Sequence, residues 1–160
     1  MNPEAVRLIR VSWHQISTRR ELTAVMFYGR LFELEPGLRE MFHDTDFHRQ
    51  RTKFIATLDL LVRFADQPDD LIREAAQLGR QHANRNLSSR NYEMAGEALL
   101  WTLDRSLGLD FTPATRAAWT ELYSLVASVI RRASGRISDV TVTVSHLPPN
   151  EGSGSFPGCS

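Results

Sequence analysis

The feature that most limits the possible folds is a succession of apolar stripes at helical spacing, running from Pro3 to about Ala133. Apolar side chains recur there at steps of three and four, as on the buried face of an α-helix. The first stripe consists of Val6, Ile9, Trp13 and Ile16. Proline and glycine interrupt the pattern, so the sequence predicts an all-α domain whose helices are joined by short loops.

Local start and stop signals predict where these helices lie. Asn2 is the expected N-cap of the first helix, with proline at its first position. In the second helix we expect Val25, Tyr28 and Phe32 on one side. The first expected helix starts at Pro3, the second spans about Glu21 to Leu34, and the third runs from near Phe47 to the break at Pro68. The fourth ends near His82, the fifth spans about Asn91 to Leu107, and the last begins at Thr112–Pro113.

Composition excludes several classes of partner. The chain has 160 residues, of which 42% are hydrophobic and 24% charged, and this suits one globular domain. Lys+Arg and Asp+Glu number 19 each, so no net charge points to nucleic acid or a membrane surface. The single cysteine, Cys159, favours a reducing compartment. With no signal-peptide pattern and no membrane-length apolar run, we expect a cytoplasmic protein.

The sequence changes character after Arg136. Residues 140–144, Val-Thr-Val-Thr-Val, alternate as in a β-strand, and residues 147–160 are rich in proline, glycine and serine. We therefore expect a domain over 1–136 and a flexible tail over 137–160. The short strand either is disordered or pairs with another copy, so the protein is expected to be a monomer or a homodimer.

One histidine stands out because it closes an apolar stripe. Leu71, Ala75, Leu78 and His82 follow one another at steps of four, three and four. Taken alone, such a histidine more often bonds the last carbonyls of its helix than binds a metal. No further ligating side chain follows three or four residues later, which disfavours a zinc site. A haem supplies four nitrogens of its own and needs only one proximal histidine.

The helix that carries Gln50 precedes the His82 helix and is joined to it by a short loop containing Pro68. The two helices can therefore run antiparallel and face each other across a flat cofactor. Most of the chain, from about Asn2 to Ala133, resembles the single-domain bacterial haemoglobins, the globin domain of flavohaemoglobins and, in places, the neuroglobins. The stretches that carry the resemblance are Leu8–Arg10 with Ser12–Trp13, Phe27–Pro36, Leu38–Phe42, Leu78–His82, Gly96–Leu100, and Phe111–Trp119 with Tyr123.

The resemblance implies a globin fold and a set of haem contacts. His82 matches the proximal histidine that binds iron, and Phe42 matches the phenylalanine that wedges against the macrocycle. Tyr28 and Gln50 match the distal tyrosine and glutamine of the bacterial proteins, which stabilise a bound oxygen ligand. Neuroglobins have an iron-binding histidine where this chain has Gln50, so an open sixth position is implied here. His48 is a rival distal group, but the two-residue offset turns it to another side of the helix.

Further contacts follow from the same resemblance. Phe54 narrows the distal pocket, and Lys53 can reach a haem propionate. Leu78 and Leu87 match apolar residues against the proximal face of the ring, and Tyr92 matches a tyrosine near the proximal histidine. Seen alone, aromatic residues at helical spacing are more often core residues, and a glutamine or lysine on a helix is more often solvated.

One departure from the flavohaemoglobins is expected to matter. They carry a glutamate that completes a proximal network, and the matching position here is Ser134, with Arg131, Arg132 and Arg136 nearby. A carboxylate behind an imidazole raises its basicity towards a metal, so strong activation of an O–O bond is not expected. The residues after Arg136 are also too few to form a reductase domain.

The resulting hypothesis is a protein that uses haem b to bind or transport oxygen. With a separate reductase, such a protein can also detoxify nitric oxide by oxidising it to nitrate. The alternatives are a haem-based gas sensor, which would need an output partner, and a globin-fold scaffold without haem.

Overall fold

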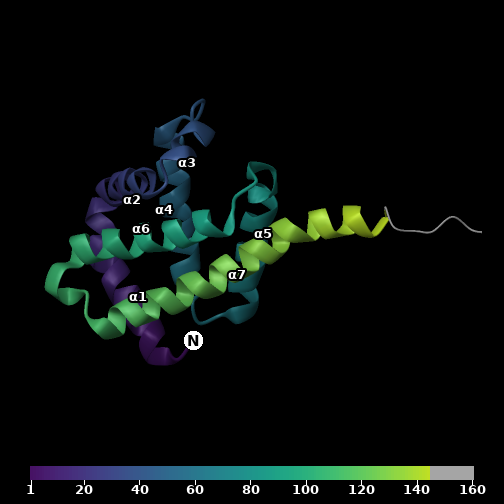
Figure 1. The fold of residues 1–160 in the computed structure, drawn as a ribbon. Helices are drawn as coiled ribbons and strands as arrows, with labels where there is room; N and C mark the ends of the chain where they lie inside the picture. The colour runs from purple at the N-terminus through teal and green to yellow at the C-terminus, as the bar shows by residue number, and fades with distance from the viewer. Residues whose placement is uncertain (145–160) are drawn as a thin grey trace, which may run out of the picture.

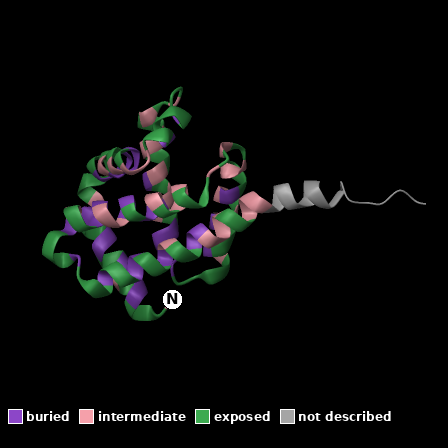
Figure 2. Ribbon diagram, viewed as in Figure 1, coloured by how far each residue is buried: buried purple, intermediate pink, exposed green. Residues whose placement is uncertain are grey.

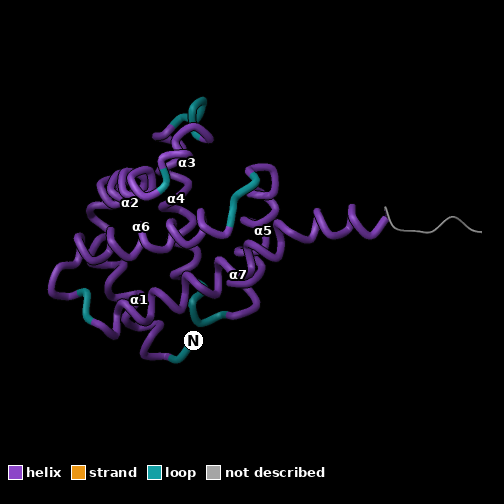
Figure 3. The backbone as a smooth tube through the Cα atoms, viewed as in Figure 1, coloured by secondary structure: helices purple, strands orange, loops and turns teal. Residues whose placement is uncertain are grey.

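The computed structural model describes the backbone of residues 1–144 and the side chains of residues 1–135. Within that range the chain is helical and contains no strand, which confirms the all-α prediction (Figure 3). The α-helices are α1 (Pro3–Ile16), α2 (Arg20–Leu34), α3 (Pro36–Met41), α4 (Phe47–Arg63), α5 (Pro68–His82), α6 (Ser89–Leu107) and α7 (Pro113–Val144). Short 3-10 turns occur at η1 (Ser17–Arg19), η2 (Ala83–Arg85) and η3 (Gly108–Asp110).

The helix starts follow from local chemistry. The Asn2 side chain accepts a hydrogen bond from the backbone N–H of Ala5 at 2.8 Å, so Asn2 caps α1 as predicted. Ser88 and Asn91 form a reciprocal capping box at the start of α6. Pro68 occupies the first turn of α5, where its missing N–H has no intrahelical partner to lose.

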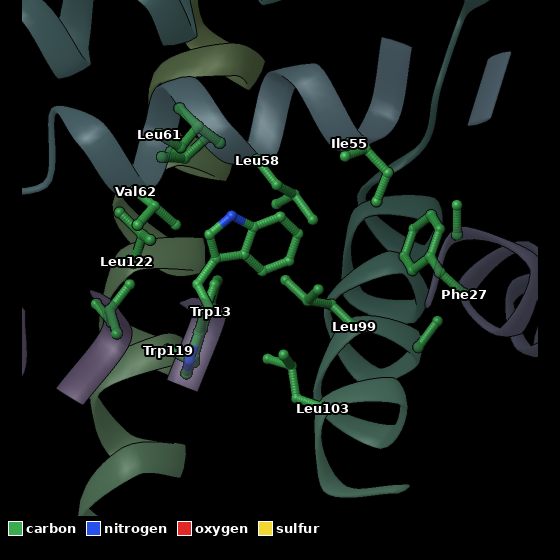
Figure 4. Packing of buried hydrophobic residues seen from close by; sticks show 14 of the residues in the cluster. Trp13, Phe27, Ile55, Leu58, Leu61, Val62, Leu99, Leu103, Trp119 and Leu122 are labelled. Carbon is green, nitrogen blue, oxygen red and sulfur yellow. The ribbon is translucent and has the colours of Figure 1, made fainter. Parts of the chain in front are cut away.

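The core lies where α1, α4, α6 and α7 meet. Figure 1 shows α6 and α7 running next to each other, and Figure 2 shows the buried residues on their inner sides. In Figure 4 the side chains of Trp13 and Trp119 meet among leucines of α4 and α6. Their ring centroids are 6.1 Å apart, and the indole N–H of Trp119 donates to Ser12 Oγ at 2.8 Å. Trp119 is only 1% exposed, so its truncation to alanine would cost about 3–5 kcal/mol.

Close packing between α5 and α7 positions the end of α5. A Cβ atom on Gly79 would lie 2.6 Å from Ala133 Cβ and 2.6 Å from the Ile130 carbonyl oxygen. Only glycine allows the two helices to approach this closely. Ser134 Oγ, on α7, lies 2.9 Å from the Gly79 carbonyl and the same distance from the Ile130 carbonyl. The last turn of α5, which carries His82, is therefore anchored on α7.

Two local predictions are wrong. Val25 is 46% exposed, because α2 buries the side that carries Thr23, Ala24, Phe27 and Tyr28. The strand predicted at residues 140–144 is part of α7, which continues to Val144. A helix already under way gains one hydrogen bond for each added residue, whereas a lone strand leaves its backbone groups unpaired. The rest of the predicted tail, 145–160, lies outside the described residues.

None of the helices in residues 1–144 is both long and apolar enough to cross a lipid bilayer.

Candidate functional site

A buried polar pair joins α2 and α4. Gln50 Nε2 donates a hydrogen bond to Tyr28 Oη at 3.1 Å, and the Tyr28 side chain is 7% exposed. Burial raises the pKa of the Tyr28 phenol, so the hydroxyl keeps its proton at neutral pH. Because the oxygen of Tyr28 accepts from Gln50, its own hydrogen remains available to donate to a ligand.

Aromatic rings surround this polar pair. Phe54 stacks on Phe27 with centroids 4.2 Å apart and an interplanar angle of 11°, and it meets Tyr28 edge to face at 5.6 Å. On the other side, Phe42 lies 6.2 Å from Tyr28 and is itself buried, and Phe47 lies 6.1 Å from Phe42. These contacts hold the tyrosine ring in a narrow, apolar environment.

His82 is the last residue of α5 and is half-buried. Its Nδ1 lies 2.6 Å from the Leu78 carbonyl oxygen, which can only accept, so Nδ1 carries the proton. Burial lowers the pKa of the imidazole, and the charges of Arg85 and Lys53 lower it further. Together these effects outweigh the hydrogen bond to Leu78, which raises the pKa. His82 is therefore a neutral imidazole whose Nε2 has a free electron pair, the form that binds metals.

Two cations, Lys53 and Arg85, lie close enough to His82 to lower its pKa. Lys53 is exposed on α4, and the Arg85 guanidinium lies 4.9 Å from the Phe42 ring centroid. The charge of Arg85 reaches both Tyr28 and His82, because it lowers the pKa of each. In residues 1–135 neither cation forms an ion pair with an acidic side chain. The surroundings of His82 therefore carry positive charge that no ion pair among residues 1–135 neutralises.

Sequence reasoning missed Arg85. The 3-10 turn η2 continues the chain from His82 to Arg85, and the Arg85 guanidinium lies over the Phe42 ring; Asn86 (φ 50°) then ends the turn in a left-handed conformation. The available signal was a basic residue three positions after the histidine, in a segment rich in asparagine.

The remaining predicted residues lie near His82 or behind it. Leu78, Leu87 and Tyr92 are each half-buried. The Tyr123 hydroxyl donates to the Tyr92 carbonyl, which fixes the start of α6. Ser134 bonds backbone carbonyls, as described above, and makes no hydrogen bond to His82. His48, the rival distal histidine, is exposed.

The donor set restricts what this site can hold. Among residues 1–135, no three histidine, cysteine or acidic side chains cluster to hold a metal ion. A metal bound by His82 must therefore arrive with other donors of its own. The aromatic walls suit a flat apolar group, and the two unpaired cations suit its acidic substituents. An all-α fold with one free imidazole and a distal phenol–amide pair defines a class of helical proteins that can hold a flat metal cofactor.

Comparison with known proteins narrows this class to one family. The family model described as Globin matches residues 25–130. Neuroglobin-1 of Oncorhynchus mykiss is 30% identical and Neuroglobin of Tetraodon nigroviridis is 32% identical; each match spans 78% of this chain and 87% of the relative. A hexacoordinated haem protein from an anhydrobiotic tardigrade has the same fold, with a TM-score of 0.75 at 19% identity over 84% of this chain and 95% of that one.

The chain belongs to the globin family, and the predicted globin fold is confirmed. The expected similarity to neuroglobins is confirmed as well. The similarity to bacterial haemoglobins and flavohaemoglobins stays a prediction.

Proposed function

We propose that this globin holds haem b with His82 as the iron ligand and binds oxygen reversibly beside Tyr28 and Gln50. The observation that carries the proposal is that the charge of one residue, Arg85, acts on both His82, whose Nε2 is free, and Tyr28, which Gln50 and Phe54 hold in place. When bound, haem would supply an iron atom that His82 would hold and that would bind a diatomic ligand. Lys53 and Arg85 would hold the haem carboxylates.

The distal pair supports oxygen as the ligand. A bound oxygen molecule carries partial negative charge, and a hydrogen bond from a fixed donor in a dry pocket stabilises that charge strongly. Gln50 holds the Tyr28 oxygen, so the phenol hydrogen is directed away from the amide. Gln50 is occupied by this bond and is not a histidine, so the sixth iron position stays open to the ligand in this proposal.

A second activity follows from the same site. One nitric oxide molecule, one oxygen molecule and one electron combine to one nitrate ion, so the haem would need one electron from outside for each turnover. We therefore propose that a separate reductase in the cytoplasm supplies that electron when the protein removes nitric oxide. Stopped-flow measurement of nitric oxide consumption, with and without an added electron donor, tests this activity.

The absorption spectrum of the purified, haem-reconstituted protein tests the main proposal. We expect a Soret band, a five-coordinate high-spin ferrous form without added ligand, and a stable oxygen complex. A six-coordinate ferrous spectrum would refute the open sixth position. Absence of stoichiometric haem binding would refute the proposal and favour a haem-free scaffold.

A further inference from the structure

A cavity lies on the α7 side of His82. It has a volume of about 230 Å³ and is half open to solvent. Its walls come from α5, η2, α6 and α7, and none of Tyr28, Gln50 and Phe54 lines it. The volume corresponds to roughly seven water molecules, each occupying about 30 Å³ in the liquid. The cavity is thus large enough for a small ion and too small for a second flat cofactor.

The lining is polar and carries one charge. Arg131 supplies this charge, and the hydroxyl and amide groups come from Asn86, Ser89, Tyr92 and Ser134. Among residues 1–135, no acidic side chain belongs to the lining and Arg131 forms no ion pair. A positive group beside a polar cavity without a carboxylate favours an anion as the occupant.

The arginine is held in place for such a ligand. Its Nη2 donates to Ser89 Oγ at 2.6 Å, and its guanidinium lies 6.0 Å from the centroid of the Tyr92 ring. These contacts restrain the side chain, and within the described side chains the other N–H groups of the guanidinium have no acceptor. Two parallel N–H groups of a guanidinium match two oxygens of a planar oxyanion. Ser89 is also the first residue of the 19-residue helix α6. The positive N-terminal end of this helix's dipole adds to the positive charge of Arg131.

We propose that this cavity binds a small planar oxyanion, such as a carboxylate or nitrate, through Arg131 and Ser89. His82 lines the same cavity, so the bound anion would add negative charge near this residue. A negative charge there strengthens an imidazole as a metal ligand. This last consequence rests on the proposed haem ligation, whereas anion binding itself does not.

The test uses the full-length protein in its haem-loaded ferrous carbonyl form, which is diamagnetic and suits amide NMR. We expect acetate and nitrate to shift the amide resonances of Ser89 and Tyr92 along saturable curves. Chloride at the same ionic strength should not reproduce these curves. Repeating the titration on haem-free protein separates anion binding from haem chemistry, and the same saturation is expected there.

Matched variants decide which residue binds the anion. Arg131→Gln should weaken binding at least tenfold, whereas Arg132→Gln removes the same charge one residue away and should leave binding unchanged. Ser89→Asp places a fixed carboxylate beside the guanidinium and should abolish binding. It also keeps α6 folded, because an acid in the first turn of a helix is favourable. Shifts that fail to saturate, that chloride reproduces, or that persist in Ser89→Asp would overturn the proposal.

Discussion

The Tyr28 hydroxyl gives the sharpest prediction about ligand binding. Replacing Tyr28 with phenylalanine keeps the ring, and with it the edge-to-face contacts to Phe54 and Phe42. The change removes one buried donor, and a hydrogen bond to a charged partner contributes about 1.5–3 kcal/mol. At about 1.4 kcal/mol for each tenfold change, Tyr28→Phe should speed oxygen dissociation by roughly 10- to 150-fold.

The bond between Gln50 and Tyr28 predicts how the two residues depend on each other. In the wild-type protein the Gln50 amide is occupied by the tyrosine oxygen, so Gln50→Leu should have a smaller effect than Tyr28→Phe. Once Tyr28 has become phenylalanine, the amide is free to turn to the ligand. Removing Gln50 should therefore cost more in that background, which a double-mutant cycle measures as non-additivity.

The assay is stopped-flow displacement of oxygen by carbon monoxide from the ferrous protein. Thr102→Val is a suitable control, because it also removes a buried hydroxyl, one that donates to the Ala98 carbonyl within α6. The control should leave the dissociation rate unchanged. An unchanged rate in Tyr28→Phe, or strict additivity of Tyr28→Phe and Gln50→Leu, would refute the proposed donor geometry.

Three further predictions concern the ligand, the packing and the C-terminal segment. His82→Ala should abolish stoichiometric haem retention while exposed His48→Ala retains it, as judged by the Soret absorbance after gel filtration. Gly79→Ala should lower the free energy of unfolding by about 1–3 kcal/mol, because the added methyl group has no room against α7. Gly29→Ala, where the added methyl group meets open space, should raise the free energy of unfolding by about 0.5–1 kcal/mol. Chemical denaturation measures both changes. Truncation after Arg136 should leave haem content and oxygen binding unchanged; sedimentation of both forms would reveal a dimer that depends on the removed segment.

The local signals in the sequence were enough to predict the longer helices, but not α3, which lies where only a short turn was expected. Helix starts at Asn2–Pro3, Pro68 and Thr112–Pro113 depend on caps and on the fixed φ of proline, which act within one turn. The apolar stripes then predicted which faces are buried, as Ile9 and Trp119 show. Where local propensity and chain context disagreed, as at residues 140–144, the propensity of β-branched residues led to the wrong element.

The position of His82 at the end of its helix was also visible in the sequence, as were the separate positions of Tyr28 and Gln50. Their roles as haem ligand and distal donors came from resemblance and remain proposals. Helical spacing places a residue on one face of its helix, but it does not show which residue of a neighbouring helix that face contacts. The bond between Tyr28 and Gln50 spans 22 positions, so only the packing of α2 against α4 creates it.

The tertiary structure alone decided how the surroundings of His82 are built. Arg85, in the turn after α5, lies over Phe42 of another segment, and Ser134 bonds Gly79 because two helices approach to the limit that glycine allows. These contacts join residues far apart in the sequence. The energy of each contact changes when the distance between its atoms changes by a fraction of an ångström. A one-dimensional pattern carries no such distances, so they appear only when the helices have packed.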